Sequence, residues 1–274
     1  MRVLITNDDG YEAEGIQALR RALREIDGVE PILVAPAVNQ SAMGRSITTR
    51  EPMWVEEVRF ADGDTGFAAE GTPVDCVRFA EHGLIGQRPD LIVSGINHGS
   101  NLGDDVTYSG TVAAALEGIV LGIPAMAFSQ QAARGEMGWQ MRPALDFDVA
   151  AGLARELVIR HLSDPLPAST LLNVNCPAGE VGGIDVTRLG KRRYNDELQE
   201  VDTDGDSRRR FRLYGFEPSY DDEPGTDLAA VARNRASMTP LHFDLTDSES
   251  LEVVRGWDAD GFLERAVAGI AETP

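Results

Sequence analysis

MRVLITNDDG, residues 1–10, places two adjacent carboxylates and a turn residue directly after a short apolar run. Residues 3–6 are apolar or β-branched without polar alternation, which is typical of a strand that is buried on both faces of a parallel sheet. After Asp8, Asp9 and Gly10, apolar residues recur at helical spacing and predict a helix over about residues 15–26. These residues therefore predict a strand, a turn that carries two carboxylates, and a helix.

The two carboxylates are candidates for a metal site. Ligands of open α/β sheets bind outside the carboxyl ends of the strands, so we expect Asp8 and Asp9 at the floor of a binding crevice. Two carboxylates this close repel each other, and a hard divalent cation with oxygen ligands relieves the repulsion. Because Asp and Gly are also ordinary turn residues, solvated acids in a turn are an equal alternative on these ten residues alone.

Acidic residues outnumber basic ones by 45 to 25 in this chain of 274 residues, which gives a formal net charge of −20. Such a field repels a nucleic-acid polymer or an anionic membrane, so neither is expected as a partner. Lys191 is the only lysine, and an acidic, lysine-poor composition is typical of halophilic proteins. We therefore favour a halophilic archaeon as the source. The alternative is a GC-rich genome, which also replaces lysine by arginine.

Cysteine usage and hydropathy predict the compartment. Cys76 and Cys176 lie far apart in the sequence and indicate neither a disulfide framework nor a zinc site. We expect them to be buried thiols in a reducing cytosol. No apolar run approaches the roughly 20 residues that span a bilayer. Met1 leads straight into the first strand without a charged and apolar leader, so a cytoplasmic protein is expected.

Strand-like apolar runs alternate with helical patterns up to about residue 182, and they predict a three-layer α/β sandwich with a mostly parallel sheet. An edge hairpin or meander is expected within residues 47–68. Thr72 as a cap and Pro73 at the first position predict a helix that reaches about residue 84. The remaining strands are expected at 31–36, 89–95, 123–128 and 170–174, and the remaining helices at about 111–121 and 145–161.

The pattern changes beyond about residue 183. Short strands are expected at 186–189, 210–213 and 238–245, with a final amphipathic helix after residue 260. We therefore predict a Rossmann-like catalytic core at residues 1–182 and, in the same structural unit, a hairpin arm and C-terminal helix at residues 183–274. The basic clusters 191–193 and 208–210 are expected to pair with acids rather than to bind substrate.

Two polar loops follow predicted strands and could join the carboxylates. Residues 37–46 follow the second strand, and Ser41 could approach Asp8 and Asp9 if that strand is parallel to the first; a solvated loop is the alternative. Residues 95–118, GINHGSNLGDDVTYSGTVAAALEG, are rich in glycine and polar side chains and run into an Ala-rich helix. A helix N-terminus carries unpaired N–H donors, so Ser109, Gly110 and Thr111 are a candidate phosphate site.

Four ordered motifs resemble the SurE family of survival-protein nucleotidases: ITNDDG at 5–10, NQS at 39–41, GTPVDCV at 71–77 and SGINHGSNLGDDVTYSGTVAAALEG at 94–118. The segments VTRLGKRRY at 186–194 and SMTPLHFDLT at 237–246 extend the similarity over nearly the whole chain. The resemblance implies a Rossmann-like fold. It also implies a C-terminal part that exchanges elements between subunits to form homodimers and sometimes homotetramers.

The resemblance also implies the site residues. By motif position, one divalent metal ion per subunit, Mg²⁺ or Mn²⁺, would be bound by Asp8, Asp9, Ser41 and Asn97. These residues all offer oxygen ligands, as such ions prefer. The substrate phosphate would be bound by Asn101, Ser109, Gly110 and Thr111. Ala42 departs from the family pattern, in which many members have glycine after the ligating serine.

The implied activity is hydrolysis of nucleoside monophosphates to nucleoside and phosphate, that is, a 5′-nucleotidase; activity on 3′-nucleotides and short polyphosphate is left open. Asp8 and Asp9 are the predicted catalytic residues, with Asp8 as general base or as orienting group for the attacking water. A covalent phosphate on Asp8 is the mechanistic alternative. His98 is left out of the predicted set because a lone histidine in a loop is more often structural.

A different function class is a non-catalytic, Mg²⁺-dependent nucleotide sensor or receiver-like module, which would bind a nucleotide without turning it over. Receiver domains are shorter and need a lysine late in the fold, and Lys191 in its basic cluster is a poor candidate. A Rossmann dehydrogenase is excluded because the first turn lacks G-x-G-x-x-G.

Overall fold

The computed structural model describes residues 1–133, 145–194, 197–204, 208–213 and 219–271. The first strand, β1 (Arg2–Thr6), lies in the middle of the sheet and is buried on both faces. Val3 and Ile5 pack into one hydrophobic core, and Leu4 packs into a second core on the opposite face. The unbroken apolar run therefore forms the kind of strand that the sequence predicts.

β1 pairs in parallel with β2 (Glu30–Pro36) and with β5 (Leu91–His98). The nine-stranded sheet has the order β3-β4-β2-β1-β5-β6-β7-β13-β8, and only β3 with β4 and β13 with β7 pair antiparallel. The other strands of this sheet are β3 (Val55–Arg59), β4 (Thr65–Ala69), β6 (Ala125–Gln130), β7 (Leu171–Cys176), β8 (Ile184–Val186) and β13 (Ala236–Leu241).

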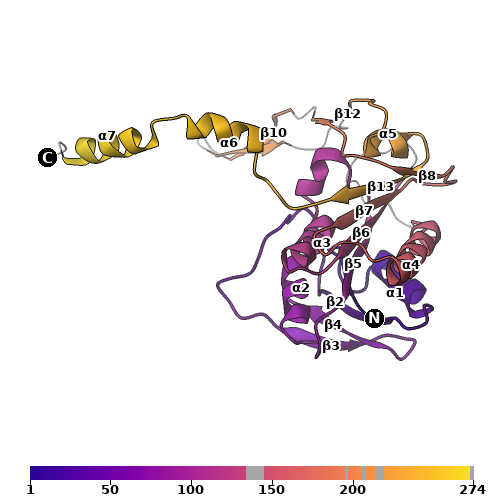
Figure 1. The fold of residues 1–274 in the computed structure, drawn as a ribbon. Coiled ribbons are helices and arrows are strands. Elements are labelled where there is room, and N and C mark those ends of the chain that lie inside the picture. Colours follow the sequence, from indigo (N-terminus) through magenta and orange to yellow (C-terminus); the bar gives the residue numbers. More distant parts are fainter. Residues whose placement is uncertain (134–144, 195–196, 205–207, 214–218, 272–274) are drawn as a thin grey trace. The chain divides into compact units, whose positions relative to one another are not determined.

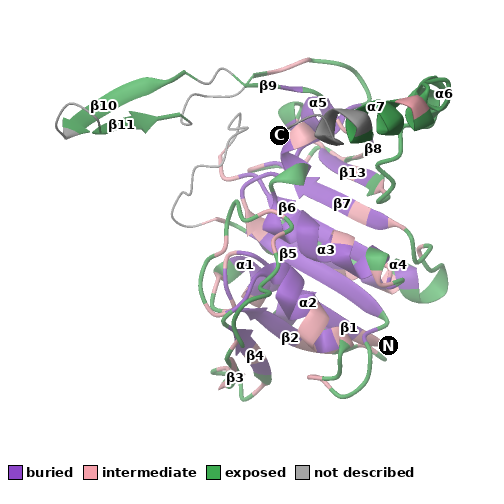
Figure 2. Cartoon of the chain, turned by 90° about the vertical axis from the view of Figure 1, so that its left-hand side faces the viewer, coloured by how far each residue is buried: buried purple, intermediate pink, exposed green. Residues whose placement is uncertain are grey.

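Four helices cover the two faces of this sheet (Figures 1 and 2). On one face, α1 (Glu14–Arg24) packs beside α4 (Asp148–Ser163), and on the other, α2 (Pro73–Glu81) packs beside α3 (Gly110–Val120). Thr72 caps α2 as predicted, and the structure adds a capping box with Asp75. The predicted three-layer α/β sandwich with an edge hairpin is confirmed, and both cysteines are buried and free.

Residues after 183 contribute to the central sheet as well as to a hairpin. β8 and β13 extend the sheet beyond β7, while β10 (Gln199–Asp204) and β11 (Arg208–Arg212) form a separate antiparallel pair. A further short pair joins β9 (Arg192–Arg193) to β12 (Ser219–Tyr220). The chain separates into two compact units, Met1–His242 and Phe243–Pro274. The functional boundary at residues 182 and 183 stays a prediction.

Two helices were not expected from the sequence. The first, α5 (Asp227–Ala232), spans six residues, which is too short for a periodic apolar pattern. Its start is marked by Thr226, whose hydroxyl accepts a hydrogen bond from the N–H of Ala229. The second, α6 (Ser248–Arg255), is capped by Asp247 and precedes the predicted final helix, α7 (Ala259–Ala271).

Candidate active site

The turn after β1 is held by its own asparagine. The side-chain amide of Asn7 donates to the carbonyl of Gly10 at 2.9 Å, and its side-chain oxygen accepts from the N–H of Gly10 at 3.2 Å. Asn7 is fully buried, so this closed turn fixes the intervening residues at the carboxyl end of the strand. The carboxylates of Asp8 and Asp9 therefore sit at the edge of the sheet where parallel α/β folds bind ligands.

Asp8 contacts Thr111, which is 103 positions later in the chain and also lies near Asn97. The hydroxyl of Thr111 donates to Oδ1 of Asp8 at 2.5 Å and lies 3.4 Å from Oδ1 of Asn97. Asn97 is at the end of β5, just after an irregularity in the pairing of that strand with β6. The carboxylate oxygen and the amide oxygen thus converge on one hydroxyl at the N-terminus of α3.

Gly110 allows this close approach of α3 to Asp8. A Cβ atom built on Gly110 would lie 2.7 Å from Cβ and 2.8 Å from Oδ2 of Asp8, distances that real Cβ contacts do not show. Ser109 caps the helix by accepting a hydrogen bond from the N–H of Val112 at 3.1 Å. The helix therefore begins directly against the first carboxylate.

Asp9 and the loop at residues 37–46 are also connected. Oδ2 of Asp9 accepts from the backbone N–H of His98 at 3.1 Å, and Oδ1 lies 3.5 Å from the side-chain amide of Asn39. The N–H of Gln40 donates to the carbonyl of Asp8 at 2.7 Å, and that of Ser41 donates to Oδ1 of Asn39 at 2.8 Å. The loop with the exposed Ser41 therefore starts beside the carboxylate pair.

The residue after Ser41 has a left-handed backbone. Ala42 has φ of 62°, a conformation that glycine adopts without a steric cost and that other residues seldom adopt. This gives a physical reason for the glycine that the family resemblance implies at this position. Alanine adopts the same backbone here, so its methyl group does not prevent the loop from forming.

An ion pair with a buried carboxylate connects the same loop to α3. Glu117 on the helix is almost fully buried, and its carboxylate accepts from the guanidinium of Arg45 at 2.5 Å and also pairs with Arg78 of α2. The N–H of Gly44 donates to the carbonyl of Tyr108, just before the helix, at 3.1 Å. Sequence reasoning missed Asn39, Arg45 and Glu117, although Asn39 and Glu117 lie within quoted motifs.

The surroundings of the two carboxylates disfavour their ionised forms. The pKa of Asp8 is raised to about 6 by burial and, to a smaller extent, by the charge of Asp9, while hydrogen bonds from Thr111 act in the opposite direction. Burial also raises the pKa of Asp9 to about 6, opposed by the N–H of His98. Both shifts have the sign expected for adjacent acids in a desolvated place, where a cation would favour their ionised forms.

The donor set fits a hard divalent cation. The described residues contain no group of three or more His, Cys, Asp and Glu side chains that could hold a metal, so a site here must use other oxygens. Oδ1 of Asn97 and Oδ1 of Asp8 both lie near the hydroxyl of Thr111, and the loop that carries Ser41 starts beside both acids. Carboxylate, amide and hydroxyl oxygens are the ligands that Mg²⁺ and Mn²⁺ favour.

The four residues predicted to bind the substrate phosphate do not all contact the same part of the site. Gly110 and Thr111 contact Asp8, and Ser109 is buried as the cap of α3. Asn101 instead donates its side-chain amide to the hydroxyl of Ser129 on β6 at 2.8 Å. Its backbone carbonyl accepts from the side chains of Asn173 and Asn175, both at 3.0 Å, so these two asparagines of β7 support the loop that leads to α3.

His98 packs beside the site. Its ring lies against that of Phe147 with centroids 5.0 Å apart, and burial lowers its pKa. Burial therefore favours its neutral form, and only its backbone N–H contacts Asp9 among the hydrogen bonds of the described residues. The omission of His98 from the catalytic set stays a prediction.

Comparisons with known proteins agree with one family. The family model described as Survival protein SurE matches residues 3–196. A 5′-nucleotidase SurE of Rubrobacter xylanophilus is 50% identical over 269 residues, which cover 97% of this chain and 100% of that protein. A 5′-nucleotidase SurE of Myxococcus xanthus is 46% identical over 264 residues and 95% of each chain.

A solved structure agrees as well. The crystal structure of the Sure protein from Aquifex aeolicus is similar with a TM-score of 0.77 and 37% sequence identity, over 93% of this chain and 98% of that one. The family model covers more than half of the sequence, and the relatives align over nearly all of it. The chain belongs to the SurE family.

Proposed function

We propose that this protein is a metal-dependent phosphomonoesterase that hydrolyses nucleoside monophosphates to nucleoside and phosphate. The observation that carries the proposal is the meeting of the Asp8 carboxylate, the Asn97 amide oxygen and the Thr111 hydroxyl at the N-terminus of α3. The relatives named 5′-nucleotidase SurE support a nucleotide as substrate. A helix N-terminus beside a cation site suits a phosphoryl group, which needs donors for its oxygens and neutralisation of its charge.

The residues of the site would bind either the metal ion or the phosphoryl group. Asp8, Asp9, Asn97 and Ser41 would hold one divalent ion, Mg²⁺ or Mn²⁺. When bound, that ion supplies charge neutralisation and lowers the pKa of a coordinated water. Ser109, Gly110 and Thr111 would bind the phosphoryl oxygens, with the Ser109 hydroxyl and the helix N–H groups as donors, since the Thr111 hydroxyl donates to Asp8. Asn101 would support this site from the preceding loop.

Asp8 is the proposed general base or orienting group for the attacking water. Its position at the turn after β1, fixed on one side by Thr111 and closed on the other by Gly110, leaves little freedom to its carboxylate. Such fixation favours a single attack geometry. A covalent phosphate on Asp8 is the alternative, and trapping a phosphorylated carboxylate during turnover would establish it and contradict direct attack by water.

The test is phosphate release from a panel of nucleoside 5′- and 3′-monophosphates and short polyphosphate. We expect release with Mn²⁺ or Mg²⁺, loss of release with a chelator, and recovery when the metal is restored, because the adjacent carboxylates need a cation to bind an anionic substrate. Equilibrium binding of the same nucleotides is measured in parallel. Nucleotide binding without release would instead support the sensor interpretation.

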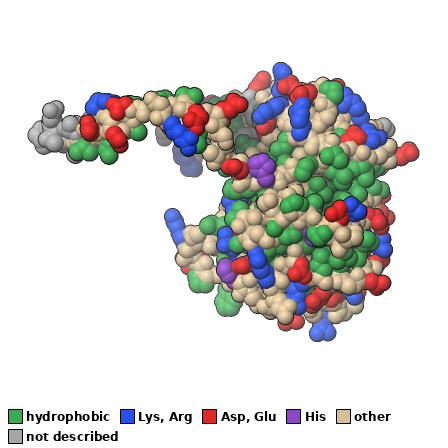
Figure 3. Space-filling view, viewed as in Figure 1, with side chains coloured by type: hydrophobic (Ala, Val, Ile, Leu, Met, Phe, Trp, Pro, Cys, Tyr) green, Lys and Arg blue, Asp and Glu red, His purple; other side chains and the backbone are tan. Residues whose placement is uncertain are grey.

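We further propose association of two copies through the C-terminal helices, with a tetramer as a higher state. The helices α6 and α7 carry exposed apolar side chains (Figure 3), namely Leu251, Val253, Val254, Phe262, Leu263 and Val267. Exposed apolar groups in this density are typical of an interface. Replacing Phe262 and Leu263 by serine is expected to shift the mass from light scattering towards that of the monomer. An unchanged mass would contradict this location.

No helix among the described residues has the length and apolarity needed to cross a membrane. The cytoplasmic location, the halophilic archaeal source and the division of roles between residues 1–182 and 183–274 stay predictions. The assays are therefore run at low and at molar salt, since a halophilic protein should lose folding or activity at low salt.

A further inference from the structure

We propose that Asp105, Arg192, Tyr194 and Asp227 are positioning residues for the phosphate site. They fix the turn formed by residues 101–107, which leads directly into Ser109 and α3. We call this segment the 101–107 turn; it includes a short 3₁₀ helix, η1 (Gly103–Thr107). The inference rests on the proposed function, because it assumes that the N-terminus of α3 binds phosphate.

The first half of the 101–107 turn is held by residues from the C-terminal half of the chain. The carbonyl of Asn101 accepts from two side chains of β7, as described above. Leu102 is fully buried in a separate apolar cluster with Leu228 and Val231 of α5. The turn is thus packed against elements that are more than seventy residues later in the sequence.

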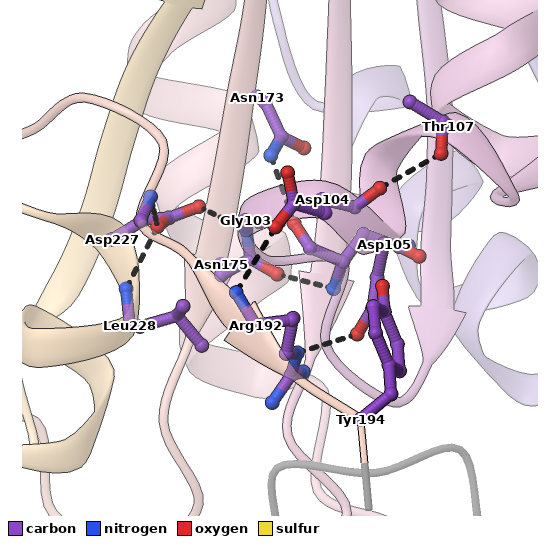
Figure 4. Close-up of polar contacts among 12 residues, drawn as sticks. Gly103, Asp104, Asp105, Thr107, Asn173, Asn175, Arg192, Tyr194, Asp227 and Leu228 are labelled. Carbon is purple, nitrogen blue, oxygen red and sulfur yellow. Dashed lines mark hydrogen bonds and ion pairs between the residues drawn. The ribbon is translucent and has the colours of Figure 1, made fainter. Parts of the chain in front are cut away.

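The carboxylate of Asp227 joins the turn to the segment 190–194 (Figure 4). Its Oδ2 accepts from the N–H of Gly103 and its Oδ1 from the N–H of Gly190 and of Leu228, each at 2.8 Å. Asp227 is fully buried. A Cβ atom on Gly103, which has φ of +56°, would lie 2.8 Å from the carbonyl oxygen of Gly190, so the two backbones touch. One buried carboxylate therefore sets the spacing between these backbones.

The second half of the turn is fastened by the segment 190–194 itself. The guanidinium of Arg192 donates through Nε to Oδ2 of Asp105 at 2.7 Å, with side chains that are 0% and 3% exposed. The hydroxyl of Tyr194 donates to Oδ1 of the same carboxylate at 2.7 Å, so both of its oxygens are engaged (Figure 4). Asp104 accepts from Nζ of Lys191 and from the N–H of Arg192, both at 3.0 Å.

The 101–107 turn is followed almost directly by the residues of the candidate active site. Tyr108 alone separates Thr107 from Ser109, the cap of α3, and the next two residues contact Asp8. The carbonyl of Tyr108 also accepts from Gly44 in the loop that carries Ser41. A displacement of the turn would therefore move the helix N-terminus relative to the carboxylates.

A buried ion pair is better suited to fixing a position than to adding stability. The free energy lost when Asp and Arg side chains leave water offsets most of the free energy gained from their attraction. Apolar side chains of the same volume therefore often stabilise a fold equally well. The two-oxygen engagement of Asp105 and the three N–H groups on Asp227 instead restrict geometry. This restriction would keep the hydrogen-bond donors at the N-terminus of α3 aligned with a phosphoryl group.

The test uses the conservative variants Tyr194→Phe and Arg192→Lys in the full chain. Tyr194→Phe removes one hydroxyl from a partly exposed side chain, so the variant is expected to fold even if Arg192→Lys does not. Calorimetric titration with inorganic phosphate, in the presence of Mn²⁺, is expected to show affinity lowered about fivefold in each variant, the effect of one lost hydrogen bond. KM for a nucleoside monophosphate should rise by a similar factor and kcat should change less.

The control is Arg235→Lys. Arg235 pairs with Asp185 at 2.8 Å and joins β13 to β8, without contact to the 101–107 turn among the described hydrogen bonds. This variant should lower the melting temperature without weakening the binding of phosphate. Titration with Mn²⁺ alone should give wild-type affinity in all three variants, because the metal residues are not altered.

The outcomes separate this inference from the proposed function. Weaker phosphate binding with unchanged Mn²⁺ affinity in Tyr194→Phe supports it. Wild-type phosphate affinity in the folded variants overturns it, whatever their melting temperatures, and so does an equal loss of phosphate and Mn²⁺ binding. A wild-type protein that binds phosphate but releases none from nucleotides contradicts the proposed function alone. A wild-type protein that does not bind phosphate overturns both.

Discussion

Asp8→Asn is expected to lower kcat/KM for a nucleoside monophosphate by about 10³-fold or more. The reason is that the loss of a metal ligand and of the proposed water-orienting group removes several kcal/mol of transition-state stabilisation. The amide has the same shape and can still accept from Thr111, which donates to Oδ1 of the wild-type carboxylate. The loss should therefore come from charge and metal binding rather than from altered packing.

Thermal unfolding in chelator separates this effect from misfolding. Replacing the buried one of two adjacent carboxylates by an amide relieves their repulsion, so the metal-free variant should melt at or above the wild-type temperature. Asp27→Asn is the matched control, because Asp27 is exposed in the connection before β2, at the opposite edge of the sheet. Full activity of Asp8→Asn in the presence of metal would contradict the assigned site.

Gly110→Ala is expected to lower activity by about 10²-fold, because a misplacement of about 1 Å at a reacting group has an effect of this order. The added methyl group would lie 2.7 Å from Cβ and 2.8 Å from Oδ2 of Asp8, so either the carboxylate or the start of α3 must shift. Overpacking of this kind also costs about 1–3 kcal/mol of stability. Steady-state kinetics with metal titration and the free energy of unfolding measure both effects.

Gly152→Ala in α4 is the control for the same chemical change. A Cβ atom there would meet nothing within 4 Å, and alanine is preferred over glycine inside a helix. This variant should gain about 0.5–1 kcal/mol of stability and keep wild-type activity. If Gly110→Ala behaved like Gly152→Ala, the close contact between α3 and Asp8 would not matter for catalysis.

The sequence by itself determined the element types of the α/β core and its layer architecture, although it did not indicate α5 and α6. Short continuous apolar runs such as residues 3–6 are typical of strands covered on both faces, and the intervening helical periodicity predicts the covering helices. Sequence also placed the carboxylates at a strand end and a helix N-terminus, the candidate phosphate site, after residue 109. These features are local, because each depends on spacing within about ten residues.

Tertiary structure alone decided which of these local features meet. Thr111 reaches Asp8 across 103 positions in the chain, and no spacing in the sequence indicates a contact of 2.5 Å. The basic residues 191–193 were expected to pair with acids, and they do, but Arg192 reaches Asp105 across 87 positions. Residues after 183, expected as an arm, also extend the sheet and support the 101–107 turn.

The physical reason is that secondary structure follows from short-range periodicity, whereas a buried charge finds its partner only when whole elements pack. Asp105 and Arg192 look like ordinary surface residues in the sequence, since both lie in polar, glycine-containing stretches. Their burial is produced by the packing of α5 and the segment 190–194 against the turn. The fold class was thus encoded locally, while the geometry of the phosphate site depends on contacts between distant parts of the chain.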